Sequence, residues 1–368
     1  MRPQIKTWPA YPSSAIGAED RQRHARDTFH RAAKTADLRP KNNAVRIAVL
    51  ASLVLALIYF LITQAGLTAA SVEQALERVT GLAFFGVFAL TAANMAFSTL
   101  KWLVVMRGLI PGRGDARPRF VDAMLATTCG ALLGQVMPIQ AAVPLARALA
   151  GSLGVGRGPL LNFGTAAFEQ VFDLLVLGFA LTVGALALVL RPASGGWLAL
   201  IAVGIVIGVV ASMPVRSLLR AVARSLDRRS IAGGIRAKLT AAILRMAELP
   251  PAACAGLIAL SVLSYLSHLL RVAIVLGALG MSAYTAKVLL AFPLVQAIAL
   301  LPLTPGSLGV TEWSWSATLV WLGATINAGA LFAVTARLIG LMSQALVAAV
   351  LIALRFRDRA WRPAAAPE

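Results

Sequence analysis

Charge is scarce in this chain, and acidic charge is the scarcest. Only 13% of the 368 residues are charged and 15 are Asp or Glu, whereas 59% are hydrophobic. The mean hydropathy of +0.79 lies far from the average for soluble globular proteins and is typical of polytopic membrane proteins. We therefore expect an all-α protein that crosses a membrane several times.

Cysteine is rare, and the motifs of soluble enzymes are missing. Cys129 and Cys254 both lie in apolar segments without metal-ligand spacing, so we interpret them as small core residues. The sequence contains no P-loop, no dinucleotide fingerprint, no His-Glu-x-x-His and no Gly-x-Ser-x-Gly. We therefore expect no cofactor, no metal and no catalytic residue, although a membrane-embedded transferase stays open as an alternative.

Basic residues dominate the charge that remains, and the formal net charge is +19. Most arginines lie between or beside apolar segments, where the positive-inside rule and anionic lipids account for them, so we expect no nucleic-acid partner. We expect a disordered basic tail at 1–43, a transmembrane domain at 44–354 and a short basic tail at 355–368, with both termini cytoplasmic. Within the domain, 216–245 spaces arginines four apart, which predicts an amphipathic helix on an anionic leaflet.

Apolar runs of two kinds make up the domain. Two of them, 121–150 and 288–322, are interrupted by prolines. If the basic clusters all face the cytoplasm, each interrupted segment enters and leaves on one side. That predicts two re-entrant helical hairpins, the first opening to the cytoplasm and the second to the outside; two ordinary kinked spans are the alternative. Six uninterrupted runs are near or above the roughly 20 residues that a bilayer requires: 45–63, 81–106, 159–190, 197–213, 252–279 and 329–354.

This topology contains a possible inverted repeat. A span, a hairpin and a span follow one another from 81 to 190, and the same order recurs from 252 to 354 in the opposite orientation. Inverted repeats place a substrate site between the halves near the midplane and expose it to either side by rocking. We therefore expect the functional groups to lie between the two halves.

The sharpest break in the helical pattern lies in the second interrupted segment. Pro305 removes a backbone donor, Gly306 and Gly309 loosen the backbone, and Glu312 adds a carboxylate. Hydrocarbon tolerates such a break only where protein buries it or water reaches it. We expect Pro305 and the two glycines to form the tip of the second hairpin, and Pro138 to mark the tip of the first.

Three carboxylates lie within apolar segments, where an ionised side chain is costly and usually faces an interior cavity. Glu169 and Asp173 are four residues apart and share one helix face, and Glu312 follows the second tip. Such carboxylates can hold a cation or a proton in transit. The equally weighted alternative is buried salt bridges that fix helix packing.

Three arginines within the apolar segments are candidate salt-bridge partners for these carboxylates. They are Arg147, Arg271 and Arg337. A guanidinium fork also suits phosphate, so these side chains are candidates to hold a lipid head group. Arg271 lies three residues after His268, near the end of its span, and we weigh snorkelling toward the interface as its simpler role.

Three segments together resemble a known family. The run 305–312, Pro-Gly-Ser-Leu-Gly-Val-Thr-Glu, closely resembles the Pro-Gly-Gly-x-Gly-x-x-Glu signature of the lysylphosphatidylglycerol synthase transmembrane, or flippase-like, family. Residues 169–175 resemble its Glu-Arg-x-x-Asp-Leu-Leu segment, and 132–147 take the place of its Leu-Pro-x-x-x-Gly-Glu-x-x-Arg hairpin. The positions that match are Pro305, Gly306, Gly309, Glu312, Glu169, Asp173, Pro138 and Arg147.

Departures from the family pattern limit what the resemblance implies. Gln170 stands where the family has arginine, and the Gly-Glu of the first hairpin is replaced around 141–144, so a head-group contact there is altered. The soluble aminoacyl-transfer domain of the lysyl-lipid synthases has no counterpart in these 368 residues. The resemblance therefore implies the flippase module alone.

The function that the resemblance implies is movement of a lipid between leaflets of the bacterial inner membrane. The expected substrate is a phospholipid or an isoprenoid- or glycolipid-type lipid. We expect Glu169, Asp173 and Glu312 to handle charge or protons, and Arg147 and Arg337 to meet the phosphate. Two alternatives stay open: a non-catalytic subunit that scaffolds a lipid-modifying enzyme, and a membrane transferase.

Overall fold

The computed structural model describes residues 62–109, 119–155, 159–190, 248–301 and 303–360, together with a few positions between 52 and 60. The chain divides into two compact units, 1–52 and 53–368, and the helices from residue 69 onward all belong to the second. Its described residues contain helices and turns but no strand, which confirms the all-α class. The predicted span at 197–213, the predicted amphipathic helix at 216–245 and more than half of the predicted span at 45–63 lie outside the described residues.

Long helices occupy four of the predicted spans. Each has 28 residues or more, so at about 1.5 Å per residue each exceeds the thickness of a bilayer core. The last of them continues to Ala360, into the tail predicted to begin at 355. These helices are α4 (Gly81–Leu109), α7 (Pro159–Leu190), α10 (Pro251–Ala278) and α13 (Ile326–Ala360).

A fifth apolar helical stretch, Ser282–Ala299, is also long enough to cross a membrane. It combines the short turn η2 (Ser282–Tyr284) with α11 (Thr285–Ala299), and its larger part belongs to the interrupted segment 288–322. Five helical stretches in the described residues thus meet the length and composition of a span. The protein is a multi-pass integral membrane protein.

Both interrupted segments fold as two helices joined by a short break. The first contains α5 (Phe120–Leu133) and α6 (Ile139–Val155), and the second contains α11 and α12 (Val310–Trp321). The first chain break ends at Pro138, whereas Pro144 stays inside α6 and Pro293 inside α11. A proline therefore marks a break only where neighbouring residues also leave the helix.

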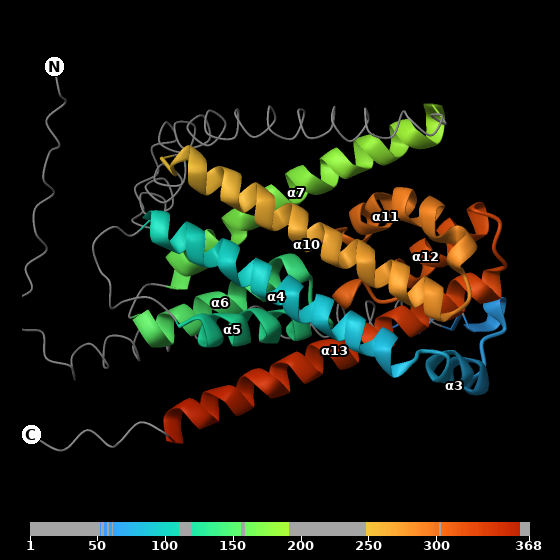
Figure 1. Cartoon of the computed structure of the whole chain (residues 1–368), viewed down its shortest axis with the longest axis horizontal. Helices are drawn as coiled ribbons and strands as arrows, with labels where there is room; N and C mark the ends of the chain where they lie inside the picture. The colour runs from blue at the N-terminus through green and yellow to red at the C-terminus, as the bar shows by residue number, and fades with distance from the viewer. Residues whose placement is uncertain are drawn as a thin grey trace, which may run out of the picture. The chain divides into compact units, whose positions relative to one another are not determined.

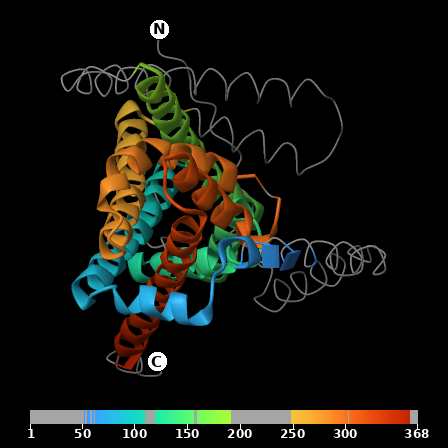
Figure 2. The same cartoon turned by 90° about the vertical axis from the view of Figure 1, so that its right-hand side faces the viewer.

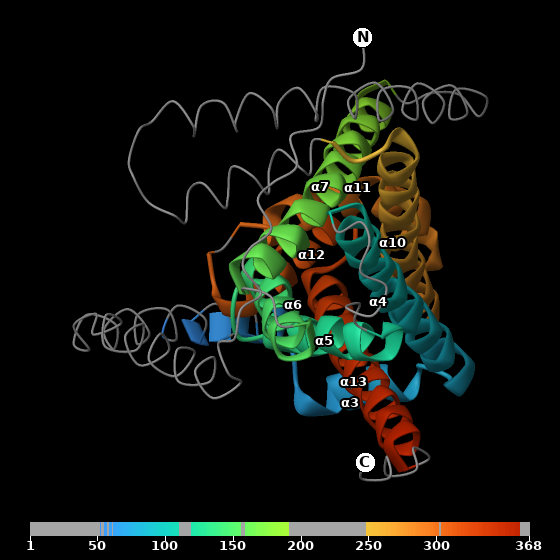
Figure 3. The same cartoon turned by 90° about the vertical axis from the view of Figure 1, so that its left-hand side faces the viewer.

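The two pairs of short helices lie toward opposite ends of α4 and α10. Figure 1 shows α5 and α6 near one end and α11 and α12 near the other, and its colours show that α4 and α10 run in opposite directions. Figure 2 looks onto the end with α11 and α12. Figure 3 looks onto the end with α5 and α6, which cross α13.

Helix packing follows one pattern in both halves. The most extensive helix contact joins α4 to α10. Each second short helix packs on the long helix that follows it, α6 on α7 and α12 on α13. Each first short helix packs on the last long helix of the other half, α5 on α13 and α11 on α7. The two halves are therefore interleaved rather than merely adjacent.

Small residues allow the closest helix contacts. A Cβ added at Gly130 would lie 2.8 Å from the Cα of Val143, between α5 and α6. One at Gly184 would lie 2.5 Å from the carbonyl oxygen of Leu290, between α7 and α11, and one at Gly329 would lie 3.0 Å from the Cα of a serine in α12. These contacts match the small-residue packing common in membrane helices.

Helix α3 (Ala69–Glu77) and an aromatic core complete the described unit. Thr68 caps the start of α3 in a reciprocal hydrogen-bonded arrangement with Ser71. A chain of ring contacts, with centroids 5.2–6.0 Å apart, joins Tyr265, Phe292, Trp315 and Phe332. This core links α10, α11, α12 and α13 beside the candidate site.

Candidate functional site

The break between α11 and α12 is built from residues in unusual backbone conformations. Gly306, Ser307 and Gly309 have positive φ values of 60°, 53° and 79°, a region that glycine enters without a Cβ penalty. The backbone N–H of Gly309 donates to Oε2 of Glu312 at 2.7 Å, so this carboxylate caps the start of α12. The run 305–312 thus forms a tight turn, and Glu312 stabilises this turn by accepting a hydrogen bond from Gly309.

The two breaks lie against each other. A Cβ added at Gly306 would lie 2.1 Å from the carbonyl oxygen of Gln135, in the first break. The Nη2 atom of Arg337 donates to Oε1 of Gln135 at 3.1 Å and to the carbonyl oxygen of Gly306 at 3.0 Å. Nε2 of Gln140, on α6, donates to the carbonyl oxygen of Leu300 at 3.1 Å. The tips predicted around Pro138 and Pro305 are therefore in contact.

Arg337 is the side chain that joins both tips. Its Nη1 pairs with Oε1 of Glu312, while its Nη2 contacts the tips at Gln135 and Gly306. The Arg337 side chain is 18% exposed and that of Glu312 is 8% exposed. The ion pair therefore spans α12 and α13 while staying at the edge of an accessible space.

Arg147 and Glu169 form a second ion pair, between α6 and α7, and it is fully enclosed. Their side chains are 0% and 2% exposed. Arg147 also donates to Oγ1 of Thr127 at 3.0 Å and to Oγ of Ser98 at 2.9 Å, and its guanidinium lies 5.4 Å from the ring centroid of Trp102. Most donors of this buried arginine are thus occupied.

Asp173 pairs with Lys101, a residue that sequence reasoning did not single out. Nζ of Lys101, on α4, contacts Oδ1 of Asp173, on α7; the lysine is 1% exposed and the aspartate 42% exposed. The available signal was a lysine within the apolar run 81–106, where a cation is costly without a partner. Glu169 and Asp173 share a helix face, as predicted, but use different partners from different helices.

Arg271 does not point toward a helix end. Its Nη1 donates to Oγ1 of Thr91 at 3.1 Å, and its Nη2 lies 2.5 Å from Nδ1 of His268. Its buried Nε has no hydrogen-bond partner, and no described carboxylate lies within ion-pair distance. Arg271 therefore differs from Arg147 and Arg337, each of which meets a glutamate.

Two adjoining cavities lie among these groups. The carboxylate cavity has a volume of about 290 Å³ and is lined by Glu169 and Asp173, among others. The arginine cavity has a volume of about 300 Å³ and is lined by Arg271, Arg337 and Glu312, among others. Residues that line both cavities are Ile139, His268, Phe292, Gln296, Leu300 and Gln344.

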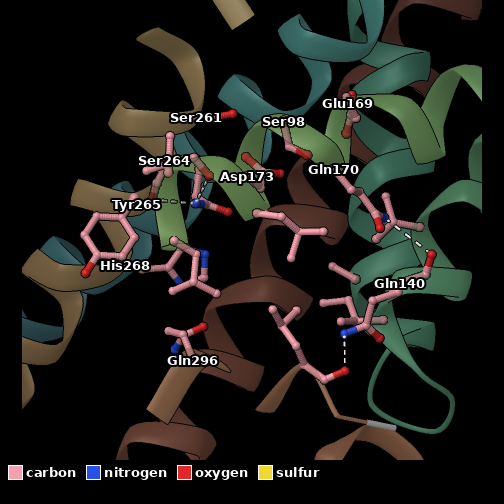
Figure 4. A pocket seen from close by; sticks show the side chains of 18 of the residues that line it. Ser98, Gln140, Glu169, Gln170, Asp173, Ser261, Ser264, Tyr265, His268 and Gln296 are labelled. Carbon is pink, nitrogen blue, oxygen red and sulfur yellow. Dashed lines mark hydrogen bonds between the residues drawn. The ribbon is translucent and has the colours of Figure 1, made fainter. Parts of the chain in front are cut away.

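The lining of the carboxylate cavity is rich in hydrogen-bonding groups. Figure 4 shows labelled side chains of both halves arranged around it, with Asp173 between Ser264 and Glu169. Glu169 Oε2 and Ser261 Oγ are buried and have no hydrogen-bond partner among the described residues. Gln170, which replaces the family arginine, also lines this cavity and donates to the carbonyl oxygen of Gln140 at 3.4 Å.

The side chains around the two cavities include groups that can hydrogen-bond a polar ligand. The described residues contain no cluster of three or more His, Cys, Asp or Glu that could hold a metal ion. Carboxylate, amide, hydroxyl and guanidinium groups offer hydrogen-bond donors and acceptors. Apolar side chains, among them Ile139, Phe292 and Leu300, form part of the wall that both cavities share.

The predicted site residues thus fall into two groups. The structure brings Arg337, Glu312, Gly306 and the first tip together around the arginine cavity, with Arg271 on the same cavity. Glu169 and Asp173 line the carboxylate cavity, whereas Arg147 does not line it and pairs with Glu169. Sequence reasoning missed the amides of Gln135, Gln140 and Gln296, since isolated glutamines in apolar helices carry no spacing pattern.

Comparison with known proteins supplies the family. No curated protein and no solved structure gave a match. A family model described as the lysylphosphatidylglycerol synthase TM region matches residues 45–348. This match covers most of the chain and every residue that lines the two cavities. The chain therefore belongs to the lysylphosphatidylglycerol synthase transmembrane family.

Proposed function

We propose that this protein moves a polar-headed lipid across the bacterial inner membrane, with both of its termini in the cytoplasm. One observation carries the proposal: two adjoining cavities, each with charged and hydrogen-bonding side chains in a largely apolar lining, lie where the two helix breaks meet. Charged and polar side chains inside an apolar bundle provide a path on which a head group avoids hydrocarbon. The substrate class is a phospholipid or a lipid-linked sugar.

The proposal includes an inverted repeat with two re-entrant hairpins. The exchange of α4 with α10, α5 with α11, α6 with α12 and α7 with α13 leaves the pattern of helix packing unchanged. Ion pairs follow the same exchange, since Arg147 and Glu169 join α6 to α7 while Glu312 and Arg337 join α12 to α13. Helices α5, α6 and α12 have 12–17 residues, fewer than a bilayer requires, and the two breaks meet at a shared contact. Both observations support hairpins over kinked spans, although η2 and α11 together reach the length of a span.

The test is lipid movement in vesicles made from purified protein. Labelled phosphatidylglycerol, an aminoacylated lipid and an undecaprenyl-linked sugar are added separately, with and without a pH gradient, and transfer between leaflets is measured. Gln296 lies on the wall that both cavities share, so Gln296→Trp fills the path. We expect this variant to abolish movement of any lipid that the wild-type protein carries.

A matched control lies two residues away on the same helix. Leu294 is 45% exposed and lines neither described cavity, so Leu294→Trp adds the same ring outside the path. We expect Leu294→Trp to retain movement. Equal rates in wild type and Gln296→Trp contradict the proposal. A folded protein that moves no lipid but binds a lipid-modifying enzyme favours the scaffold alternative, and group transfer to a lipid favours the transferase.

A further inference from the structure

Arg271 has no ion-pair partner among the described residues, whereas Lys101, at the equivalent position of the other half, has one. Lys101 lies twenty residues after Gly81, the first residue of α4, and Arg271 lies twenty residues after Pro251, the first residue of α10. The two cations thus occupy equivalent positions in equivalent helices. Lys101 pairs with Asp173 on α7, so the equivalent partner of Arg271 belongs on α13.

No carboxylate stands at the equivalent place on α13. Asp173 lies fourteen residues after the start of α7, and the same offset in α13 reaches Gly340. If the helices are instead matched through their ion-pair residues Glu169 and Arg337, Asp173 corresponds to Leu341. Gly340 and Leu341 both line the arginine cavity, and a Cβ added at Gly340 meets nothing within 4 Å. The second half therefore has open space where the first half has a carboxylate.

The charges around the two cavities are unequal as a result. Glu169 and Asp173 are neutralised by cations that do not line the carboxylate cavity, and Glu312 neutralises Arg337. Among the described residues, Arg271 alone adds an unbalanced positive charge to the lining of the arginine cavity. A ligand with one negative charge balances it, and a phosphodiester matches a guanidinium by paired hydrogen bonds.

The carboxylate cavity favours an uncharged, hydroxyl-bearing extension of that ligand. Its two carboxylates are already paired, so a full cation gains little there. The lining also contains uncharged amide and hydroxyl side chains, among them Asn94, Ser264 and Gln296. Hydroxyl groups of a ligand match such side chains, because each hydroxyl can donate and accept.

We propose that the two cavities form one site for a lipid with a singly charged phosphodiester and a polyhydroxyl head group, with the phosphate taking at Arg271 the place that Asp173 takes at Lys101. This deepens the proposed transport function and rests on it for the lipid nature of the ligand. The geometry selects against head groups whose phosphate is balanced by an ammonium and against head groups without hydroxyls.

Transport selectivity provides the first test. Vesicles receive three labelled lipids with identical chains: phosphatidylglycerol, phosphatidylethanol with the same charge but no free hydroxyl, and phosphatidylethanolamine with a balancing ammonium. We expect wild-type protein to move phosphatidylglycerol about tenfold faster than either of the others. Equal rates for the three lipids, or faster movement of phosphatidylethanolamine, overturn the proposal.

Two charge variants test the position of the phosphate. We expect Arg271→Gln to slow phosphatidylglycerol about tenfold, while Lys287→Gln, which removes an exposed cation from α11, leaves the rate unchanged. Gly340→Asp supplies the missing carboxylate and is expected to exclude the phosphate, so that it slows phosphatidylglycerol about tenfold more than Gly340→Asn, which adds a similar side chain without charge. Undiminished phosphatidylglycerol movement in Arg271→Gln overturns the assignment.

A binding measurement separates this inference from the transport proposal. Thermal unfolding of the detergent-solubilised protein is followed with glycerophosphoglycerol or glycerophosphoethanolamine added. We expect glycerophosphoglycerol alone to raise the melting temperature of wild type and of Lys287→Gln, whose lysine lines neither cavity, but not of Arg271→Gln. That result supports the site even if no lipid moves, in which case only the transport proposal fails. No shift in wild type, or equal shifts in wild type and Arg271→Gln, overturns the site.

Discussion

Each intramembrane carboxylate of the described residues has its own basic partner, but the three pairs are enclosed to different degrees. Arg147 and Glu169 are almost fully buried, whereas Asp173 and Arg337 retain exposed surface. When one member of an enclosed ion pair is replaced, the remaining charge is buried without compensation. When the remaining residue is partly exposed, water can solvate its charge. The pairs should therefore respond differently to the same substitution.

Glu169→Gln is expected to be the more damaging of two matched neutral substitutions. It leaves the guanidinium of Arg147, which is 0% exposed, without a counter-charge, at a cost of about 3–5 kcal/mol of unfolding free energy. Unfolding of the protein in mixed micelles measures the loss. The double substitution Arg147→Met with Glu169→Leu should recover part of it, and no recovery would argue against charge burial as the cause.

Glu312→Gln is expected to cost less, about 1–2 kcal/mol in the same assay. The amide oxygen can still accept from the N–H of Gly309, and Arg337 keeps its contacts with Gln135 and Gly306. The substitution therefore weakens the ion pair with Arg337 but keeps the turn between α11 and α12. A larger loss than for Glu169→Gln would reverse this ranking.

Sequence reasoning could find the charged residues more readily than their partners. Spacing alone placed Glu169 and Asp173 on one face, because helix periodicity is local. It left Arg147, Arg271 and Arg337 as interchangeable candidates and overlooked Lys101, since the choice among them depends on which helices pack together. Tertiary packing pairs Glu169 with Arg147 and Asp173 with Lys101.

At the scale of the helices, the meeting of the two breaks is the decisive feature. The backbone of Gly306 lies against that of Gln135 with no side chain between them. Arg337 fastens this contact from α13 through hydrogen bonds to both sides. Either tip alone would leave backbone groups exposed at membrane depth, whereas together they satisfy part of that requirement.

Gly306→Ala should separate the two tips. The added Cβ would lie 2.1 Å from the Gln135 carbonyl oxygen, at a positive φ that alanine disfavours, so we expect a loss of at least about 2 kcal/mol in unfolding free energy. Gly256→Ala is the control, because a Cβ there meets nothing within 4 Å in a helix where alanine is favoured. Equal stability of the two variants in thermal unfolding would rule out close contact at the tips.

The sequence predicted the presence of both breaks but not their contact. Proline and glycine around 305–309 signalled the second break directly. For the first, the family resemblance singled out Pro138, and the break does end there while Pro144 stays inside α6. Proline within a membrane helix can be accommodated by its neighbours, so its effect depends on packing that a single sequence does not reveal.

At the scale of the whole described unit, equivalent helices have equivalent neighbours. The same exchange of halves relates helix packing, ion pairs and the positions of Lys101 and Arg271. Element order and basic clusters predicted an inverted repeat, and the exchange of helix neighbours supports that prediction. The interleaving of α5 with α13 and of α11 with α7 could not be predicted, because it depends on contacts between distant segments.

Labelling from either side tests the orientation that the repeat requires. In a background without Cys129 and Cys254, single cysteines replace the exposed residues Phe120, at the start of α5, and Thr325, after α12. We expect a membrane-impermeant maleimide to label Thr325→Cys in intact cells and Phe120→Cys only in inverted vesicles. Labelling of both from one side would refute opposed hairpins.

The glycine contacts between helices decide which parts can shift against each other. At Gly130, Gly184 and Gly329 the facing backbones touch without an intervening side chain, so sliding would drive main chain into main chain. Helix α7 must then travel with α11, and α12 with α13. Because α7 and α11 come from different halves, the moving blocks do not coincide with the repeats. We expect the mechanical joint to be the link between α11 and α12, so that an opening stroke bends one hairpin instead of tilting one half.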